Sequence, residues 1–129
     1  MTDKVKILVV EDDSSVAMMM VDLLTSAGCD THIASDAEKA VRLVQGGNFN
    51  LITLDVDLPR KNGFEICRHL KADSRLSDTP VVFVTGRSCA QDLQRGLELG
   101  AVDYITKPFD ALDFVRRLLS HVNCQKKFA

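Results

Sequence analysis

The sequence lacks an excess of positive charge. Lys and Arg number 16 against 18 Asp and Glu, which gives a net charge of −2 at pH 7. Binding to nucleic acid or to an anionic membrane surface depends on clustered positive charge. We therefore expect no direct contact with nucleic acid and no binding to a membrane.

Long apolar segments and paired metal-binding residues are also missing. The first residues, MTDKVKILVV, hold too short an apolar run for a signal peptide, and no later stretch is long enough to span a bilayer. The cysteines form no CxxC pair, and the dispersed histidines support neither a metal site nor a histidine phosphodonor. Free thiols are typical of a reducing compartment, so we expect a cytoplasmic protein. The residues concerned are Cys29, Cys67, Cys89, Cys124, His32, His69 and His121.

The sequence instead alternates short apolar runs with longer stretches of helical periodicity. This pattern is typical of a parallel sheet covered by helices on both faces. A chain of 129 residues is long enough for one such domain. The expected strands span residues 5–10, 30–34, 51–54, 81–85 and 102–105. The expected helices span residues 14–27, 36–45, 64–72, 90–99 and 111–122.

Five strand–helix units predict a flavodoxin-like, doubly wound α/β fold. Right-handed crossovers then give a single three-layer α/β/α sandwich with a five-stranded parallel sheet of order 2-1-3-4-5. We expect one domain over residues 1–122 and a short C-terminal tail over 123–129, with no output domain. Functional residues of such a sheet lie beyond the carboxyl ends of the strands, where the winding direction reverses.

Acidic, hydroxyl and basic side chains stand at these strand ends. Each alone has an ordinary explanation: Asp13 or Ser14 would cap a helix, and the others would belong to turns or be solvated. Those explanations do not account for three carboxylates, a hydroxyl and an ammonium converging on one edge of the sheet. The converging residues are Glu11, Asp12, Asp55, Thr85 and Lys107.

The converging groups suit phosphoryl transfer. Glu11, Asp12 and Asp55 would repel one another as bare carboxylates on adjacent strands. A hard divalent cation removes that conflict, and Mg²⁺ in particular takes few protein ligands and keeps coordination sites for a phosphate. Asp55 is then the natural nucleophile toward phosphorus. Lys107 would neutralise phosphoryl oxygens, and Thr85 would donate its hydroxyl to one of them.

Four segments together make the sequence resemble the receiver domains of two-component signalling, from Lys6 to about Val122. They read KILVVEDD, LITLDVDLPRKNGFEICRHLK, PVVFVTG and GAVDYITKPF. The resemblance implies a phosphorelay signal receiver that accepts a phosphoryl group onto Asp55 from a phospho-histidine donor, either a histidine kinase or a phosphotransfer protein. It implies a signalling domain rather than an enzyme, because such a domain catalyses only its own phosphorylation and dephosphorylation.

The resemblance also assigns roles to single residues. It implies that Asp55, Thr85 and Lys107 are the catalytic group, and that the Lys107–Pro108 bond is cis. The implied Mg²⁺ ligands are the carboxylates of Glu11, Asp12 and Asp55 and the backbone carbonyl of Asp57.

Tyr104 is implied to be an aromatic switch that turns inward when Thr85 moves. The movement would alter the surface of the fourth helix, the fifth strand and the fifth helix. That surface would serve a homodimer, a downstream protein target, or a covalently linked output domain absent from this chain.

Two features near the site, one pair of residues and one glycine, depart from the common pattern. Asp57 and Arg87 should face each other across the mouth of the site as an ion pair that hinders the attacking water, although two separately solvated side chains are an open alternative. Gly86 stands where a small residue such as Ala is usual, so we expect it to preserve space while loosening the backbone. Asp57, Gly86 and Arg87 are therefore the residues expected to tune the site.

Three other functions compete with the receiver interpretation. The segment LITLDVD also fits a Mg²⁺-dependent DxD phosphatase of the haloacid-dehalogenase type, but the order of acids and lysine along the chain is unlike that family. A nucleotide-binding module would need glycines where VVEDDSSV has acids. A receiver-like interaction module that is never phosphorylated remains the third alternative.

Overall fold

Strands and helices alternate throughout the part of the chain that the structure describes. The computed structural model describes residues 4–126, and the side chains of residues 4–122. The strands are β1 (Lys6–Val10), β2 (Asp30–Ala34), β3 (Leu51–Leu54), β4 (Val81–Thr85) and β5 (Asp103–Thr106). The helices are α1 (Ser14–Ser26), α2 (Ala37–Gly46), α3 (Gly63–Ala72), α4 (Ala90–Glu98) and α5 (Ala111–Lys126).

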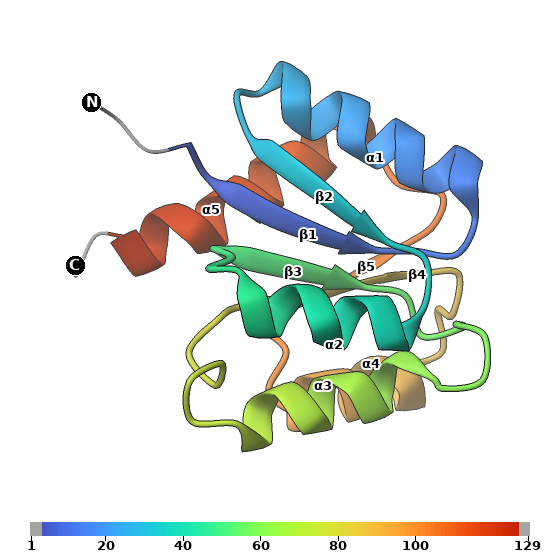
Figure 1. The fold of residues 1–129 in the computed structure, drawn as a ribbon. Helices are drawn as coiled ribbons and strands as arrows, with labels where there is room; N and C mark the ends of the chain where they lie inside the picture. The colour runs from blue at the N-terminus through green and yellow to red at the C-terminus, as the bar shows by residue number, and fades with distance from the viewer. Residues whose placement is uncertain (1–3, 127–129) are drawn as a thin grey trace.

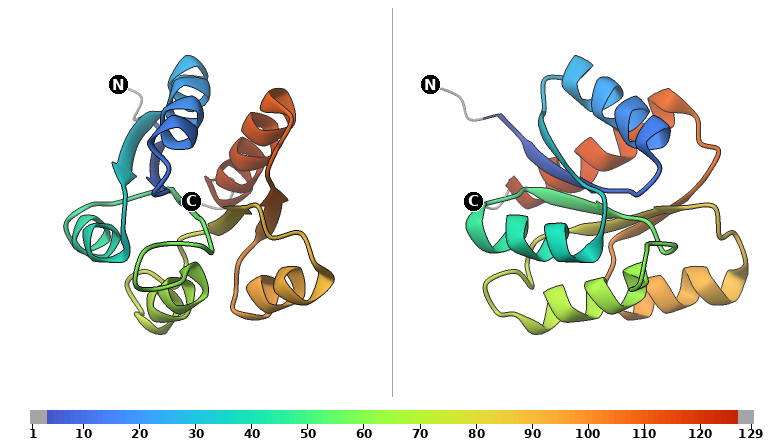
Figure 2. Two further views of the ribbon diagram at one scale, coloured as in Figure 1. Left: turned by 90° about the vertical axis from the view of Figure 1, so that its right-hand side faces the viewer. Right: turned by 45° about the vertical axis from the view of Figure 1, so that its right-hand side comes forward.

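The strands form one parallel sheet. Their order is β2-β1-β3-β4-β5, and each neighbouring pair is parallel. Figure 1 shows α1 and α5 over one face of the sheet and α2, α3 and α4 over the other. Figure 2 shows the same three layers from two further sides. The predicted three-layer sandwich and strand order are confirmed.

β1 is covered on both faces, which explains its unbroken apolar sequence. Leu8 and Val10 pack in the core that includes residues of α2 and α3, whereas Ile7 and Val9 pack in the core that includes residues of α1 and α5. Every residue of β3 and β4 is also buried. The edge strand β2 leaves two of its five residues exposed, and this matches its more polar sequence.

Side-chain caps mark where α1 and α2 begin. The carboxylate of Asp13 accepts hydrogen bonds from the backbone N–H groups of Ser15 and Val16. The carboxylate of Asp36 accepts one from the N–H of Lys39. Each satisfies an N–H that has no partner within its helix. Asp36 is thus the cap of α2 rather than its first residue.

The predicted and observed boundaries differ most at α5. This helix continues to Lys126, so its predicted end at residue 122 is wrong. The division of the chain into a domain and a C-terminal tail stays a prediction. Backbone hydrogen bonding extends a helix without need of further apolar side chains. Even so, no helix of the described chain is long and apolar enough to cross a membrane. β5 is displaced by one residue from its predicted range, because Val102 is 44% exposed and lies in the bend before the strand.

The cysteines whose side chains the structure describes are free thiols, as predicted. Cys29 and Cys67 are buried. Burial raises the pKa of both, that of Cys67 to about 11. Cys89 is exposed, and the side chain of Cys124 and residues 127–129 lie outside the described part.

A buried hydroxyl in β3 generates a prediction about stability. Thr53 is 1% exposed, and its Oγ1 has no hydrogen-bond partner among the described residues. Replacing an unsatisfied buried hydroxyl by a methyl group removes a desolvation cost. Thr53→Val is expected to raise the free energy of unfolding by about 1 kcal/mol, measured by urea denaturation.

The matched control is Thr31→Val. The Thr31 hydroxyl lies 3.3 Å from that of Thr25, and both are near the surface. This variant should gain no stability. A Thr53→Val protein no more stable than the parent would contradict the prediction.

Candidate functional site

The candidate site lies at the carboxyl edge of the sheet, where the connections after β1, β3, β4 and β5 meet. Glu11 and Asp55 directly follow β1 and β3, Thr85 ends β4, and Lys107 directly follows β5. Glu11, Asp55 and Thr85 are respectively 2%, 5% and 0% exposed. Polar groups so completely buried need partners in the protein or a bound ligand.

Backbone hydrogen bonds continue past the strand ends and hold the first residues of these loops. The N–H of Glu11 donates to Ala34 O (3.0 Å) and the N–H of Asp55 donates to Val10 O (3.1 Å). The N–H of Lys107 donates to Thr85 O at 2.8 Å. The side chains of the site therefore start from fixed backbone positions. The Lys107–Pro108 peptide bond is cis, as the resemblance implies.

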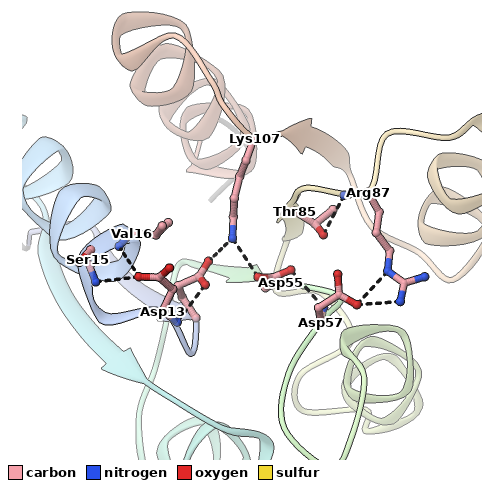
Figure 3. Close-up of polar contacts among 9 residues, drawn as sticks. Asp13, Ser15, Val16, Asp55, Asp57, Thr85, Arg87 and Lys107 are labelled. Carbon is pink, nitrogen blue, oxygen red and sulfur yellow. Dashed lines mark hydrogen bonds and ion pairs between the residues drawn. The ribbon is translucent and has the colours of Figure 1, made fainter.

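The ammonium of Lys107 lies between two buried carboxylates (Figure 3). Its Nζ is 2.6 Å from Glu11 Oε1 and 2.9 Å from Asp55 Oδ2. Burial lowers the pKa of Lys107, but hydrogen bonds and charge from Asp55 and Glu11 outweigh it, and the pKa is raised. Burial and the charge of Asp55 raise the pKa of Glu11 despite the opposing effect of Lys107. One ammonium thus does not balance the acidic charge of the site.

Three carboxylates are close enough to bind one cation. Glu11, Asp12 and Asp55 each offer an oxygen, and these oxygens lie within 4.8 Å of one another. Carboxylate oxygens are the donors that Mg²⁺ prefers, and Mg²⁺ completes its shell with water or phosphate. Asp12 is exposed while the other two are buried, so the group is open to solvent on one side. The donor set fits Mg²⁺, and the Asp57 carbonyl as a further ligand stays a prediction.

The expected contact between Asp57 and Arg87 is confirmed. Arg87 Nη2 is 2.7 Å and Nε 3.0 Å from Asp57 Oδ1. The hydrogen bond from Arg87 holds the pKa of Asp57 below its usual range. The two side chains are 46% and 58% exposed, so water screens the pair and it contributes little to stability. Its effect on a water molecule attacking the site stays a prediction.

Tyr104 points into the protein: the residue is 6% exposed, and its ring centroid lies 5.9 Å from that of Phe83. Its hydroxyl donates to the backbone carbonyl of Arg87 at 2.8 Å. Burial, followed by the charge of Asp92, raises the pKa of Tyr104 to about 12, so the hydroxyl is a donor at neutral pH. Thr85 Oγ1 accepts from the N–H of the same Arg87, at 3.3 Å. The partnership with Arg87 was not foreseen, because a backbone carbonyl leaves no mark in the sequence.

A second polar cluster on β5 and α5 was also missed. The Asp103 carboxylate accepts from Arg117 Nε at 3.0 Å and lies 3.0 Å from His121 Nε2. Burial raises the pKa of Asp103, but the hydrogen bonds from Arg117 and His121 outweigh this effect and keep the pKa low. The spacing of four between Arg117 and His121, which places both on one face of a helix, was the available signal.

Comparisons with known proteins agree on one family. The family model described as response regulator receiver domain matches residues 7–119. The DNA-binding response regulator MtrA of Mycobacterium tuberculosis is 40% identical over 117 residues, which cover 91% of this chain and 50% of that protein. The chain therefore spans about half the length of the curated relatives it matches.

Solved structures agree with the fold. A CheY-like response regulator receiver domain protein from Methanospirillum hungatei has a TM-score of 0.90 at 26% identity, covering 98% of this chain and 100% of that one. The non-phosphorylated HemR receiver domain from Leptospira biflexa has a TM-score of 0.85 at 33% identity, covering 92% of this chain and 94% of that one.

The start of α3 lies directly against the Asp55 backbone, which generates a prediction. A Cβ at Gly63 would overlap the Asp55 carbonyl oxygen and lie 2.9 Å from its carbonyl carbon. Gly63→Ala is expected to lower the free energy of unfolding by about 1–3 kcal/mol, because α3 or the acidic loop must move. Urea denaturation measures the change.

Gly86→Ala is the control from the same site. A Cβ at Gly86 meets nothing within 4 Å, so this variant should stay within about 0.5 kcal/mol of the parent. Equal stability of Gly63→Ala and the parent would contradict the close approach.

Proposed function

This chain belongs to the response regulator receiver domain family, and from that premise we propose that it accepts a phosphoryl group on Asp55 in a Mg²⁺-dependent reaction. The observation that carries the proposal is the position of the Asp55 carboxylate, 2.9 Å from the Lys107 ammonium and grouped with Glu11 and Asp12. A nucleophile, a cation-binding acidic group and a fixed positive charge are the parts that phosphoryl transfer needs.

The donor in this proposal is a phospho-histidine on a histidine kinase or a phosphotransfer protein. The bond between phosphorus and the histidine nitrogen breaks, and a bond between phosphorus and an Asp55 oxygen forms. Lys107 neutralises charge on the phosphoryl oxygens, and the Thr85 hydroxyl donates to one of them. Glu11, Asp12 and Asp55 would hold Mg²⁺, which as a Lewis acid neutralises further charge on the phosphoryl group.

The domain is a signalling module, and its own phosphorylation and dephosphorylation are the only reactions we propose that it catalyses. The match to the receiver family over residues 7–119 does not favour a DxD phosphatase or a nucleotide-binding module. The presence of Asp55, Thr85 and Lys107 in one site supports the phosphorylated form of the family over a receiver-like module that is never phosphorylated.

The signal would leave through the surface of α4, β5 and α5. We propose that Thr85 and Tyr104 switch this surface, which carries the exposed apolar residues Leu93, Leu97 and Val102. Its partner would be a downstream protein, a covalently linked output domain absent from this sequence, or a second copy of the chain. The DNA-binding function in the name of MtrA would belong to such an output domain. We propose a cytoplasmic location for the reaction.

Intact mass after incubation with acetyl phosphate and Mg²⁺ tests the acceptor. The parent is expected to gain one phosphoryl group and Asp55→Asn none, because only the Asp55 carboxylate attacks phosphorus. Labelling should disappear when EDTA removes Mg²⁺. Asp73→Asn is the control, since it removes a carboxylate outside the site and leaves the acceptor in place.

Three results would count against the proposal. Labelling of Asp55→Asn equal to that of the parent would show that another residue is the acceptor. A parent that never gains mass would be a module that is not phosphorylated. Steady turnover of a phosphomonoester such as p-nitrophenyl phosphate would favour the phosphatase alternative.

The lifetime of phospho-Asp55 tests the pair at the mouth of the site. Arg87→Ala and Asp57→Asn are each expected to speed dephosphorylation about two- to fivefold. Each variant breaks the ion pair between these side chains, so that they no longer hinder the water molecule that attacks the phosphoryl group. Loss of phosphate from the purified phosphoprotein, followed by mass, measures the rate. Arg75→Ala is the control, because it removes an exposed pair with Asp73 outside the site. Unchanged decay in both test variants would end this part of the proposal.

A further inference from the structure

The backbone of Arg87 contacts the hydroxyl groups of both expected switch residues. Its N–H donates to Thr85 Oγ1 at 3.3 Å, and its carbonyl accepts from the Tyr104 hydroxyl at 2.8 Å. A shift of this one residue therefore changes the hydrogen bonding of Thr85 and Tyr104 together.

The side chain of Arg87 is anchored on two elements. Its Nε and Nη2 lie 3.0 and 2.7 Å from Asp57 Oδ1, on the loop between β3 and α3. Its Nη1 lies 3.8 Å from Asp92 Oδ2 in the first turn of α4. A planar guanidinium has five N–H donors and can donate hydrogen bonds to two carboxylates at once. The single ammonium of a lysine does this less well.

The space that receives the Tyr104 ring is closely fitted by α4. Gly96 is the buried residue of this helix. A Cβ there would lie 3.0 Å from Phe83 and 3.2 Å from Tyr104 Cδ2. The helix backbone thus approaches the inward ring, and the ring has little room to shift within its place. The hydrogen bond from the Tyr104 hydroxyl to the Arg87 carbonyl adds to this packing in holding the ring inward.

We propose that Arg87 is a positioning residue that links the edge of the phosphorylation site to Tyr104. Its ion pairs with Asp57 and Asp92 hold the Arg87 carbonyl where it accepts the Tyr104 hydroxyl, and they thereby favour the inward position of Tyr104. The proposal that Arg87 positions Tyr104 rests on contacts in the structure. Its role in signalling rests in addition on the proposed phosphorylation of Asp55. The pair at the mouth of the site would therefore influence two properties, the lifetime of the phosphoryl group and the position of the switch.

The composition of the chain supplies a direct probe of this proposal. The protein has one tyrosine and no tryptophan, so tyrosine fluorescence reports Tyr104 alone. Acrylamide quenching, corrected for fluorescence lifetime, measures how far solvent reaches the ring. In the full chain without a phosphodonor, Arg87→Ala is expected to raise the quenching rate constant about twofold or more, because exposed ion pairs shift such an equilibrium by about two- to fivefold.

Further variants distinguish the positioning of Tyr104 by Arg87 from a general loosening of the protein structure. Asp92→Asn removes the anchor on α4, so it should raise quenching while leaving the decay of phospho-Asp55 at the parent rate. It also alters the carboxylate that accepts from the Cys89 thiol at 3.2 Å, and Cys89→Ala controls for that change and should quench like the parent. Arg87→Lys keeps the charge and should fall between the parent and Arg87→Ala. Arg75→Ala removes an Arg–Asp pair elsewhere and should quench like the parent.

Parent-like quenching in a folded Arg87→Ala protein overturns the proposal, as does an equal increase in Arg75→Ala. Circular dichroism establishes folding, and if Arg87→Ala does not fold, the double variant Asp57→Asn/Asp92→Asn decides in its place. The fluorescence measurement uses no phosphodonor, so failure of Asp55 to accept a phosphoryl group would leave its result unaffected.

Discussion

Two carboxylates almost wholly removed from water, those of Glu11 and Asp55, share the ammonium of Lys107. Moving a charge out of water costs several kcal/mol unless an opposite charge and hydrogen bonds compensate for it. One ammonium offers one positive charge against two acids, and the exposed Asp12 adds a third carboxylate to the group. The arrangement therefore retains negative charge, and a small dication such as the proposed Mg²⁺ would balance it.

The sheet explains why the acids cannot simply move apart. Backbone hydrogen bonds from Glu11, Asp55 and Lys107 continue one residue past the strands, and the strands before them are buried. The charge conflict must therefore be met by a counter-charge rather than by displacement. The close contact of Gly63 with the Asp55 carbonyl adds a constraint from α3. The backbone of the fold thus fixes the positions of the side chains that form the site.

The charged groups that follow Thr85 differ from the buried acidic site in that they lie near the surface. Arg87 makes its ion pairs near the surface, where water screens them and their energies are small. Small energies suit the switch that we propose for this segment, because a weak bias is readily reversed by a ligand. A rigid, buried charge group and an adjustable, exposed one thus lie side by side, and Thr85 and Tyr104 connect them through the backbone of Arg87.

The sequence by itself determined the fold class, the strand order and the convergence of Glu11, Asp55, Thr85 and Lys107. It could do so because buried strands are continuous apolar runs and parallel strands end at one edge. Only the tertiary structure decided that Tyr104 lies inward on the carbonyl of Arg87, a partner 17 residues away, and that Asp103 binds residues of α5. Sequence patterns report the kinds and local spacing of side chains, whereas a backbone carbonyl is the same in every residue and gains its role only when folding brings a donor to it.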